Sequence, residues 1–466
     1  MTDTLTITNP WSGEVADTYP LDGPEAVDAK VRAAQEASLK WREGPLGLRI
    51  ELVERFLVVA ESNRDEIASL ISRQMGKPVR EARNEVGGMI GRARTMVRLA
   101  PQALADQSIS LDDGIQRRIV RDPLGVILDI AAWNYPLLIA INVVAPALLA
   151  GNAVLIKHAS QTAGVGLWFE DMFRRAGAPD GLVTAVMVRG SESTALVQHP
   201  GVHGVFFTGS TEGGQQVYRT VANRSHGFVD VGLELGGKDP AYVRADMPVE
   251  LAAANLIEGA FYNAGQSCCA IERIYVHHAR YDAFVEAAVE AAKAWTSGDP
   301  THDATMLGAL ATPETLDVLD AQVADAVSKG ARLWLGGERY GGSGWRYPAT
   351  VLSDTHHEMS LMRDESFGPI IGIMPVEDDA AAVSLMNDTA YGLTASIWTS
   401  DHRAGEALGR RVQAGTVFVN RCDYVDPVLP WTGLKDSGKG VSLSSLGFAH
   451  LTRARGLHVR PLEMLG

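Results

Sequence analysis

From residue 124 to residue 234 the sequence alternates short apolar runs with stretches of helical length, and this alternation constrains the fold more than any other feature. The apolar runs predict β-strands at 126–131, 153–157, 182–188, 202–208 and 229–233. The stretches between them predict helices, among them the apolar segment 135–150. Strands that alternate with helices build a parallel sheet with helices on both faces.

A second alternation, over residues 250–435, predicts another lobe of the same kind. Its expected strands are 271–277 and 370–375, and its expected helices are 280–296, 313–329 and 378–388. A chain of 466 residues is too long for one compact core. The expected fold class is therefore α/β, with two doubly wound parallel-sheet lobes that meet just after residues 234–237.

The remaining segments extend these lobes. Residues 25–104 carry apolar side chains at intervals of three and four, which predicts helices. Residues 105–123 depart from that spacing and indicate short strands joined by turns. The tail, 451–466, also carries a strand, which pairs either with 105–123 or with a second subunit.

Charge and hydropathy exclude several classes of protein. The formal net charge of −14 argues against nucleic acid or an anionic membrane as a partner, because a large basic field is missing. The apolar segment 135–150 contains Pro136, Asn142 and Pro146, so we expect a buried helix rather than a membrane span. The N-terminus lacks a basic segment followed by an apolar one, and no secretory signal is expected.

Cysteine and histidine usage bears on redox and metal chemistry. The three cysteines are Cys268, Cys269 and Cys422. An odd number with two adjacent does not make a disulfide framework, which indicates a reducing, cytoplasmic setting. The histidine pairs at 277–278 and 356–357 lack the spacing of metal ligands, so no metal site is expected.

A thiol and a carboxylate, each close to glycine, stand about thirty residues apart. The segment 261–269 ends in Cys268 and Cys269, and the segment 233–238 (Leu-Glu-Leu-Gly-Gly-Lys) contains Glu234. A thiolate can attack an electrophilic carbon, and a carboxylate can activate the water that cleaves the resulting thioester. The alternatives are a buried core cysteine and a surface or salt-bridged glutamate.

Two further patterns are typical of nucleotide binding. The glycine-rich segment 209–214 follows an expected strand and opens an expected helix, whose N-terminal N–H groups can bind phosphate. Lys157 ends another strand and is a candidate for ribose hydroxyls, with a solvated strand-end lysine as the alternative. Glu365, before a turn, is a second such candidate, and an ordinary turn is its alternative.

Asn134 follows the strand 126–131 in the sequence Trp133-Asn-Tyr-Pro136. Its amide either donates to an oxyanion or caps the helix that follows, with proline at an early helical position. One side chain does not serve both roles well.

Together and in this order, the motifs resemble the aldehyde dehydrogenase superfamily over nearly the whole chain. The matching pieces are Trp133-Asn-Tyr-Pro, Lys157, Phe207-Thr-Gly-Ser-Thr-Glu, Leu233-Glu-Leu-Gly-Gly-Lys, Phe261 through Cys268, Glu365-Ser-Phe-Gly-Pro, Val419-Asn420 and Gly433-Leu-Lys-Asp-Ser-Gly. In that family the nucleophile stands two residues after Gly-Gln, which selects Cys268 over Cys269.

The resemblance implies a mechanism and a division of the chain. Cys268 attacks the aldehyde, the Asn134 amide and the Cys268 N–H hold the oxyanion, hydride passes to nicotinamide, and Glu234 activates the water that hydrolyses the thioester. A carboxylate at Glu234 favours hydrolysis over transfer to coenzyme A. The implied parts are an NAD(P)-binding domain (1–104 and 124–235), a catalytic domain (236–436) and an oligomerisation segment (105–123 and 437–466) that supports a homodimer or homotetramer.

The implied cofactor is NADP or NAD. The residues matched to its site are Trp133, Lys157, Ser160, Gly209, Ser210, Gly214, Leu235, Glu365 and Phe367. NAD-preferring relatives often carry glutamate three residues after the lysine at position 157, where it repels a 2′-phosphate. Ser160 stands there in this chain, so we expect NADP to be accepted alongside NAD, or preferred.

The match puts a further set of residues around the substrate: Tyr135, Leu138, Asn142, Ser267, Cys269, Asp423, Tyr424 and Trp431. The aromatic members favour aliphatic or aromatic aldehydes. Asp423 keeps a cationic aminoaldehyde open, and Arg421 keeps a carboxylated substrate such as succinic semialdehyde open.

Two rival classes remain beside this assignment. A cofactor-independent cysteine thioesterase or esterase would use the thiol and Glu234, but it normally needs a histidine near the cysteine, and none lies in the motif. A catalytically idle member of the fold has no chemical need for Cys268, Glu234 and Asn134 together.

Overall fold

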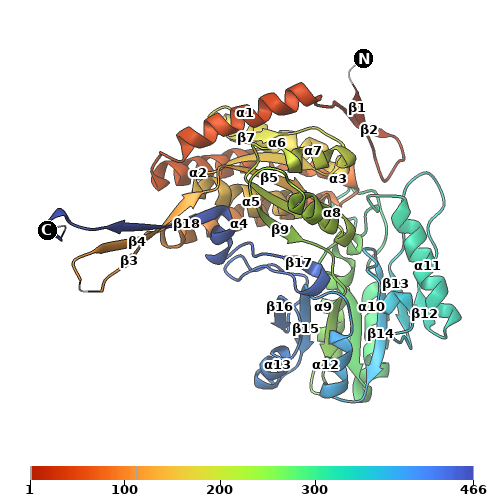
Figure 1. The fold of residues 1–466 in the computed structure, drawn as a ribbon. Coiled ribbons are helices and arrows are strands. Elements are labelled where there is room, and N and C mark those ends of the chain that lie inside the picture. The colour runs from red at the N-terminus through yellow and green to blue at the C-terminus, as the bar shows by residue number, and fades with distance from the viewer. Residues whose placement is uncertain (1–2, 112, 465–466) are drawn as a thin grey trace.

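The computed structural model describes residues 3–111 and 113–464, which form two parallel-sheet lobes and a projecting β-arm (Figure 1). The α/β class and its two parallel sheets agree with the expectation from sequence. Each lobe has its own core of buried apolar side chains, one around β5, β6 and α5 and the other around β10, β11 and β14.

The first sheet has six strands in the order β17–β9–β8–β5–β6–β7, all parallel except β17. The strands are β5 (Val126–Ala131), β6 (Ala153–His158), β7 (Val183–Ala185), β8 (Gly204–Thr208), β9 (Asp230–Glu234) and β17 (Gly438–Lys439). Its helices are α1 (Pro24–Trp41), α2 (Leu46–Ser62), α3 (Arg64–Met75), α4 (Val79–Ala103), α5 (Pro136–Ala150), α6 (Ala163–Arg175), α7 (Ser193–Gln198) and α8 (Thr211–Ala222).

The second sheet has seven strands in the order β12–β13–β14–β11–β10–β15–β16, and only β12 runs antiparallel. The strands are β10 (Asp239–Val243), β11 (Ile271–His277), β12 (Arg332–Leu335), β13 (Thr350–Ser353), β14 (Ile370–Val376), β15 (Thr394–Trp398) and β16 (Thr416–Val419). Its helices are α9 (Val249–Phe261), α10 (Tyr281–Ala292), α11 (Glu314–Ser328), α12 (Asp379–Asn387) and α13 (His402–Gly409).

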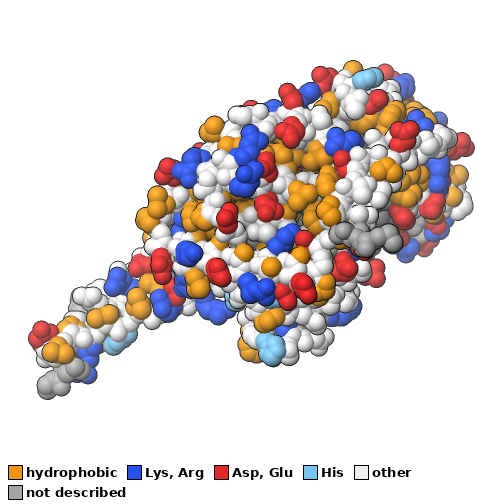
Figure 2. All heavy atoms as spheres, turned by 90° about the horizontal axis from the view of Figure 1, so that it is seen from above, with side chains coloured by type: hydrophobic (Ala, Val, Ile, Leu, Met, Phe, Trp, Pro, Cys, Tyr) orange, Lys and Arg blue, Asp and Glu red, His pale blue; other side chains and the backbone are white. Residues whose placement is uncertain are grey.

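The β-arm answers the question that the tail left open. β18 (Thr452–Val459) pairs antiparallel with β4 (Gln116–Pro123) along its whole length, and β3 (Gln107–Ile109) pairs with the other edge of β4. The tail strand therefore pairs with the 105–123 segment of its own chain. The arm projects from the body, and the face in Figure 2 mixes acidic and basic side chains rather than presenting a basic field.

Two expected elements are shorter in the structure. The strand expected over 182–188 ends at Ala185, because Met187 then exchanges backbone and side-chain hydrogen bonds with Asp22. The helix expected over 280–296 ends at Ala292, after which Ser297 bridges to Leu307. A hairpin of β1 (Thr4–Thr8) and β2 (Val15–Pro20) was not expected.

The apolar segment at 135–150 is helix α5, and all of its side chains except that of Leu138 are buried in the first core. Two prolines lie within it, one in its first turn and one inside the helix. No helix in the described ranges has the length and hydropathy needed to cross a bilayer.

Candidate active site

Four parallel strands of the first sheet end at one edge, and a residue from the sequence motifs stands at the end of each. Asn134 follows β5, and Lys157 is the last residue but one of β6. Gly209 follows β8, and Glu234 is the last residue of β9. Carboxyl ends of parallel strands are where open α/β sheets bind ligands. The topology of the sheet therefore brings these residues to the same edge, although they lie far apart in the sequence.

The second sheet turns its amino edge toward the same region. Cys268 precedes β11, and Glu365 precedes β14. The Gly237 N–H donates to Glu365 Oε1 at 2.9 Å, and a side chain at Gly237 would collide with the Cys268 carbonyl. The loop after β9 thus contacts both segments of the second sheet, and the site lies between the two sheets.

The turn before Cys268 has an unusual backbone. Asn263 and Ala264 both have a φ of 54°, and Gly265 follows with a φ of 71°. Left-handed conformations cost roughly 1–2 kcal/mol for residues other than glycine. A side chain at Gly265 would also collide with the Gly368 carbonyl, so this glycine is needed for the close approach of the two loops.

Buried hydrogen bonds hold the turn in that conformation. The Asn263 N–H donates to Glu81 Oε2 at 2.9 Å, and its amide Nδ2 donates to the Asn134 carbonyl at 3.0 Å. Gln266 Oε1 accepts from the Ala311 N–H at 2.8 Å. The Gly-Gln pair of the motif therefore has a structural task, which is to fix the backbone that presents Cys268.

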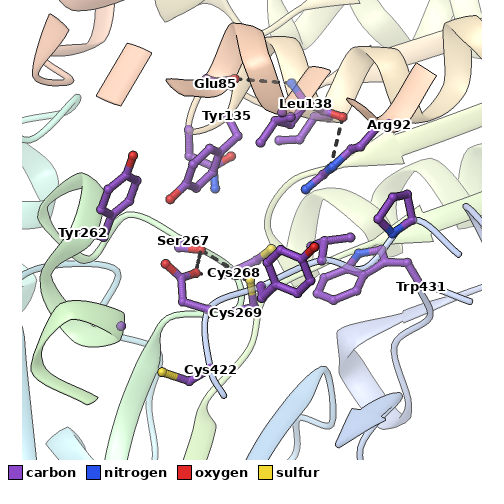
Figure 3. Close-up of a pocket in the computed structure, with 18 of the residues that line it drawn as sticks. Glu85, Arg92, Tyr135, Leu138, Tyr262, Ser267, Cys268, Cys269, Cys422 and Trp431 are labelled. Atoms are coloured by element: carbon purple, nitrogen blue, oxygen red, sulfur yellow. Dashed lines mark hydrogen bonds between the residues drawn. The ribbon is translucent and has the colours of Figure 1, made fainter. Parts of the chain in front are cut away.

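A cavity of about 790 Å³ lies in front of this turn (Figure 3). Its lining includes every residue expected to be catalytic and every residue expected to contact substrate: Asn134, Tyr135, Leu138, Asn142, Glu234, Ser267, Cys268, Cys269, Asp423, Tyr424 and Trp431. These residues come from α5 and the segment before it, from β9, from the turn before β11 and from the loop after β16. The structure thus brings them together around one space.

The two adjacent cysteines have different surroundings. Cys268 is half-buried, whereas Cys269 is 5% exposed and donates from Sγ to Asp423 Oδ1 at 3.4 Å. A hydrogen bond with Cys268 and burial raise the pKa of the Cys269 thiol. Because the thiolate is the reactive form, a raised pKa makes Cys269 the weaker candidate for the nucleophile.

Glu234 is a half-buried carboxyl that lines the same cavity. Burial raises its pKa above the ordinary value, while a hydrogen bond donated by Ser442 Oγ acts in the opposite direction. A carboxylate with a raised pKa is a better proton acceptor near neutral pH.

Asn134 does not cap α5, which was the alternative role considered for its side chain. The N-cap residue of α5 is Tyr135, and no N-cap side chain bonds the first turn. Glu85 of α4 takes that place, since its Oε1 accepts from the N–H groups of Leu137 at 2.8 Å and Leu138 at 3.3 Å. The Asn134 side chain, in a residue that is 4% exposed, lines the cavity instead.

The residues matched to a nucleotide are not part of this lining. Ser210 caps α8, with its hydroxyl accepting from the Gly213 N–H at 3.1 Å. Gly214 packs against Leu235, so tightly that a side chain at Gly214 would collide with it. Trp133 and Phe367 meet edge to face with ring centroids 5.5 Å apart.

Lys157 is buried and Glu365 is half-buried, so the alternative of a solvated lysine at a strand end does not hold. Lys157 is 4% exposed, and burial lowers its pKa to about 8. It makes no side-chain hydrogen bond or ion pair with other described residues. Burial, followed by the nearby Glu272 charge, raises the pKa of Glu365 to about 7. Ser160 begins a short 3₁₀ turn just beyond β6.

One wall of the cavity escaped the motif analysis. Helix α4 contributes Glu81, Asn84, Glu85, Gly88, Gly91, Arg92 and Thr95, which recur at intervals of three and four along one helical face. That periodicity was visible in the sequence, but nothing in it marked this face as the lining of a site. Arg92 is the cation of this wall, and Arg421 lies on the opposite loop.

The family model for the aldehyde dehydrogenase family matches residues 1–456. The chain belongs to the aldehyde dehydrogenase family. An aldehyde dehydrogenase of Paenarthrobacter nicotinovorans is 34% identical over 442 residues, which cover 94% of this chain and 96% of that protein. The NADP(+) succinate-semialdehyde dehydrogenase of Mycolicibacterium paratuberculosis is 35% identical over 450 residues, with 96% and 95% covered.

Solved structures of aldehyde dehydrogenases superimpose closely on this chain. An NAD-dependent aldehyde dehydrogenase from Sinorhizobium meliloti has a TM-score of 0.94 at 31% identity, covering 98% of this chain and 92% of its own. An NADP-dependent glyceraldehyde-3-phosphate dehydrogenase from Bacillus halodurans, solved with NADP, has a TM-score of 0.93 at 31% identity, covering 98% and 96%.

Proposed function

We propose that this protein oxidises an aldehyde to a carboxylic acid with NAD(P)+ through a covalent intermediate on Cys268. The proposal is carried by one observation: a half-buried thiol, a half-buried carboxyl and an asparagine amide meet around one cavity in a member of the aldehyde dehydrogenase family.

The Cys268 thiolate attacks the aldehyde carbon, and the negative charge moves to the carbonyl oxygen. The Asn134 amide and the Cys268 N–H donate to that oxyanion, an interaction that is strongest when the charge is fully developed. Bound NAD(P)+ supplies the acceptor for the hydride that leaves the tetrahedral carbon. Glu234 then takes a proton from water, which cleaves the thioester and releases the acid and the free thiol.

The residues at the carboxyl edge of the first sheet fit a dinucleotide. The N-terminus of α8 follows β8 directly and offers backbone N–H groups to a phosphate. Lys157, buried and without a side-chain partner among the described residues, suits ribose hydroxyls or a 2′-phosphate. With Ser160 in place of an acidic residue, NADP is accepted alongside NAD, or preferred. A kcat/KM for NAD at least about tenfold above that for NADP, a gap of about 1.4 kcal/mol, would end this expectation.

The substrate class is open to two candidates. Tyr135, Tyr424 and Trp431 line the cavity and favour aliphatic or aromatic aldehydes. Several curated relatives are succinate-semialdehyde dehydrogenases, which favours a semialdehyde instead. A kcat/KM panel of benzaldehyde, hexanal, aminobutyraldehyde and succinic semialdehyde separates these candidates.

The proposal extends to the organisation of the protein. The NAD(P)-binding part comprises residues 1–104 and 124–235, the catalytic part 236–436, and the segment for self-association 105–123 and 437–466. β17 of the last segment also adds an edge to the first sheet, which ties that segment to Glu234. The protein is proposed to act in the cytoplasm as a homodimer or homotetramer.

The decisive experiment follows the absorbance of reduced nicotinamide when aldehyde is added with NAD or NADP. Cys268→Ala is expected to lower the rate by at least about 10⁴-fold, whereas Cys269→Ala, the matched control, keeps most of it. Full turnover by Cys268→Ala would refute the covalent mechanism. Hydrolysis of an ester by the wild type without nucleotide, and no aldehyde-dependent reduction, would support the thioesterase class.

A further inference from the structure

Arg92 projects from α4 into the reaction cavity and is held by helix α5. Its Nη1 donates to Asn142 Oδ1 at 3.1 Å and to the Leu138 carbonyl at 3.4 Å. Figure 3 shows the side chain running from α4 toward the space between Tyr135 and Trp431, on the side of the cavity that faces Cys268. The helix pair α4 and α5 thus fixes the direction of one guanidinium into the substrate space.

Both acceptors of Arg92 are uncharged. Within the described ranges Arg92 forms no ion pair, and its Nε and Nη2 donate to no protein group. Burial lowers the pKa of Arg92, yet an arginine side chain stays protonated in proteins. Arg92 is half-buried and has no counterion in contact, so an anion that enters the cavity would gain a charge-assisted interaction with its free N–H groups.

Four of the five carboxyls that line the cavity have protein partners, whereas the exposed Glu258 has none among the described residues. Glu85 pairs with Lys77, Glu81 accepts from the Asn263 N–H, Asp423 accepts from Ser267 Oγ, and Glu234 accepts from Ser442 Oγ. Burial also raises the pKa of Glu81, to about 8, and raises the pKa of Glu234 and Asp423 above their ordinary values. The hydrogen bonds and the ion pair made by these four acids weaken their repulsion of an anionic substrate.

Arg421, the cation that the sequence offered for a substrate carboxylate, is oriented differently. Its guanidinium lies over the Tyr424 ring at 3.5 Å from the centroid, and the residue is exposed to solvent. Stacking on an aromatic ring and contact with water both satisfy the charge of Arg421 without a ligand. Between the two arginines of the cavity lining, Arg92 is the one that stacks on no ring and forms no ion pair among the described residues.

We propose that Arg92, oriented by Asn142, is the specificity-determining residue that binds an anionic group, chiefly a carboxylate, at the far end of the aldehyde substrate. This inference rests on the proposed function, because the aldehyde carbon must reach Cys268 while the carboxylate reaches Arg92. The preferred substrate is then an ω-oxo acid, and the guanidinium can bind its carboxylate through two N–H groups.

The test compares kcat/KM for succinic semialdehyde with that for 4-oxopentanal, an uncharged analogue of nearly the same size in which an acetyl group replaces the carboxylate. In the wild type we expect the ratio to favour the acid, and in Arg92→Gln the ratio is expected to fall about 10- to 100-fold. Arg92→Lys, which keeps the charge but not the fork, is expected to fall between them. Arg421→Gln, the matched control, is expected to change the ratio by less than about threefold.

A second variant keeps Arg92 but provides its guanidinium with an anionic partner from the protein itself. Asn142→Asp gives the guanidinium a carboxylate within the protein, and we expect the ratio to fall as it does in Arg92→Gln. Because the arginine and its packing are retained, a folding defect in Arg92→Gln would not leave the proposal without a test.

Several results would overturn the proposal. One is an equal loss for both substrates in Arg92→Gln together with a shifted pH profile of kcat, which would mean that Arg92 acts on Glu234. Another is a loss of the ratio in Arg421→Gln but not in Arg92→Gln. Failure of the proposed function is distinct, since the wild type would then oxidise neither aldehyde, or Cys268→Ala would oxidise both.

Discussion

The two sides of the cavity are built in different ways. The reactive side, around Cys268, consists of loops between sheets, with consecutive left-handed residues held by buried hydrogen bonds. The opposite wall is one regular face of α4, packed against α5. The reactive side uses backbone conformations that few sequences adopt, whereas the wall uses a helix that most sequences could form.

This difference explains where each side can vary. The reactive side needs a fixed oxyanion position and a fixed thiol, so its residues depend on one another through the turn at 263–265. Apart from Glu81, which accepts from the Asn263 N–H, the wall needs only the helix and its contact with α5. Half-buried residues of this face, such as Arg92, can therefore change without breaking either. We expect substitutions on the reactive side to affect rate and substitutions in the wall to affect stability or specificity.

The largest effect on stability is expected for Glu85→Gln in the wall. Glu85 and Lys77 form an ion pair in which both side chains are essentially inaccessible, so removing one charge leaves the other uncompensated. We expect the free energy of unfolding in urea to fall by about 3–5 kcal/mol. Glu61→Gln, which breaks the exposed pair with Arg64, is the control and should cost no more than about 1 kcal/mol. Similar losses in both variants would contradict the role of burial.

On the reactive side, Asn134→Ala is expected to lower kcat by about 10²- to 10³-fold, because one donor to the oxyanion is lost. The free energy of unfolding should change little, since Glu85 rather than Asn134 caps α5. Steady-state kinetics and urea unfolding on the same preparation separate the two effects. A large loss of stability with unchanged kcat would return Asn134 to a structural role.

Glu81→Gln tests the link between the α4 wall and the turn at 263–265, because its effect on the free energy of unfolding is expected to depend on pH. Burial raises the Glu81 pKa from 4.5 to about 8, so folding favours its protonated form. The stability from this group is complete below pH 4.5 and is lost as the pH rises toward 8. Glutamine does not titrate, so the stability of the variant relative to the wild type should rise across that pH range. The expected rise in the free energy of unfolding is on the order of a few kcal/mol. Urea unfolding of both proteins at about pH 5, 6.5 and 8, which span this range, tests the prediction. A difference in unfolding free energy that stays constant with pH would show that Glu81 stays ionised.

The smallest effect is expected for Gly91→Ala in the wall. A side chain at Gly91 would meet no atom within 4 Å, and the residue lies inside α4. Alanine should raise the free energy of unfolding by roughly 0.5–1 kcal/mol. Gly88→Ala is the matched control, because its new methyl group would lie 3.0 Å from Leu138 Cδ2 and should give less. Equal gains would mean that Leu138 moves freely.

Much of the architecture followed from local patterns. The strand at Ile271–His277 agrees with its expected bounds, and the apolar segment became α5, because a fully buried strand or helix must be apolar along its length. The order of the motifs also indicated the family and the reactive residues. Their spacing reflects short-range needs, such as a glycine where two backbones touch, which a sequence records directly.

The wall of α4, the capping of α5 by Glu85, the burial of Lys157 and the different settings of Arg92 and Arg421 were decided only by tertiary structure. The periodicity of the sequence indicated that α4 has an apolar face and a polar face. It did not indicate which polar residues border a cavity. That depends on how α4 packs against α5 and on the loop that closes the opposite side. The sequence alone determined the two sheets and led to the proposal for the reactive groups. Packing determined which charges lack a partner, because desolvation and ion pairing arise between segments far apart in the chain.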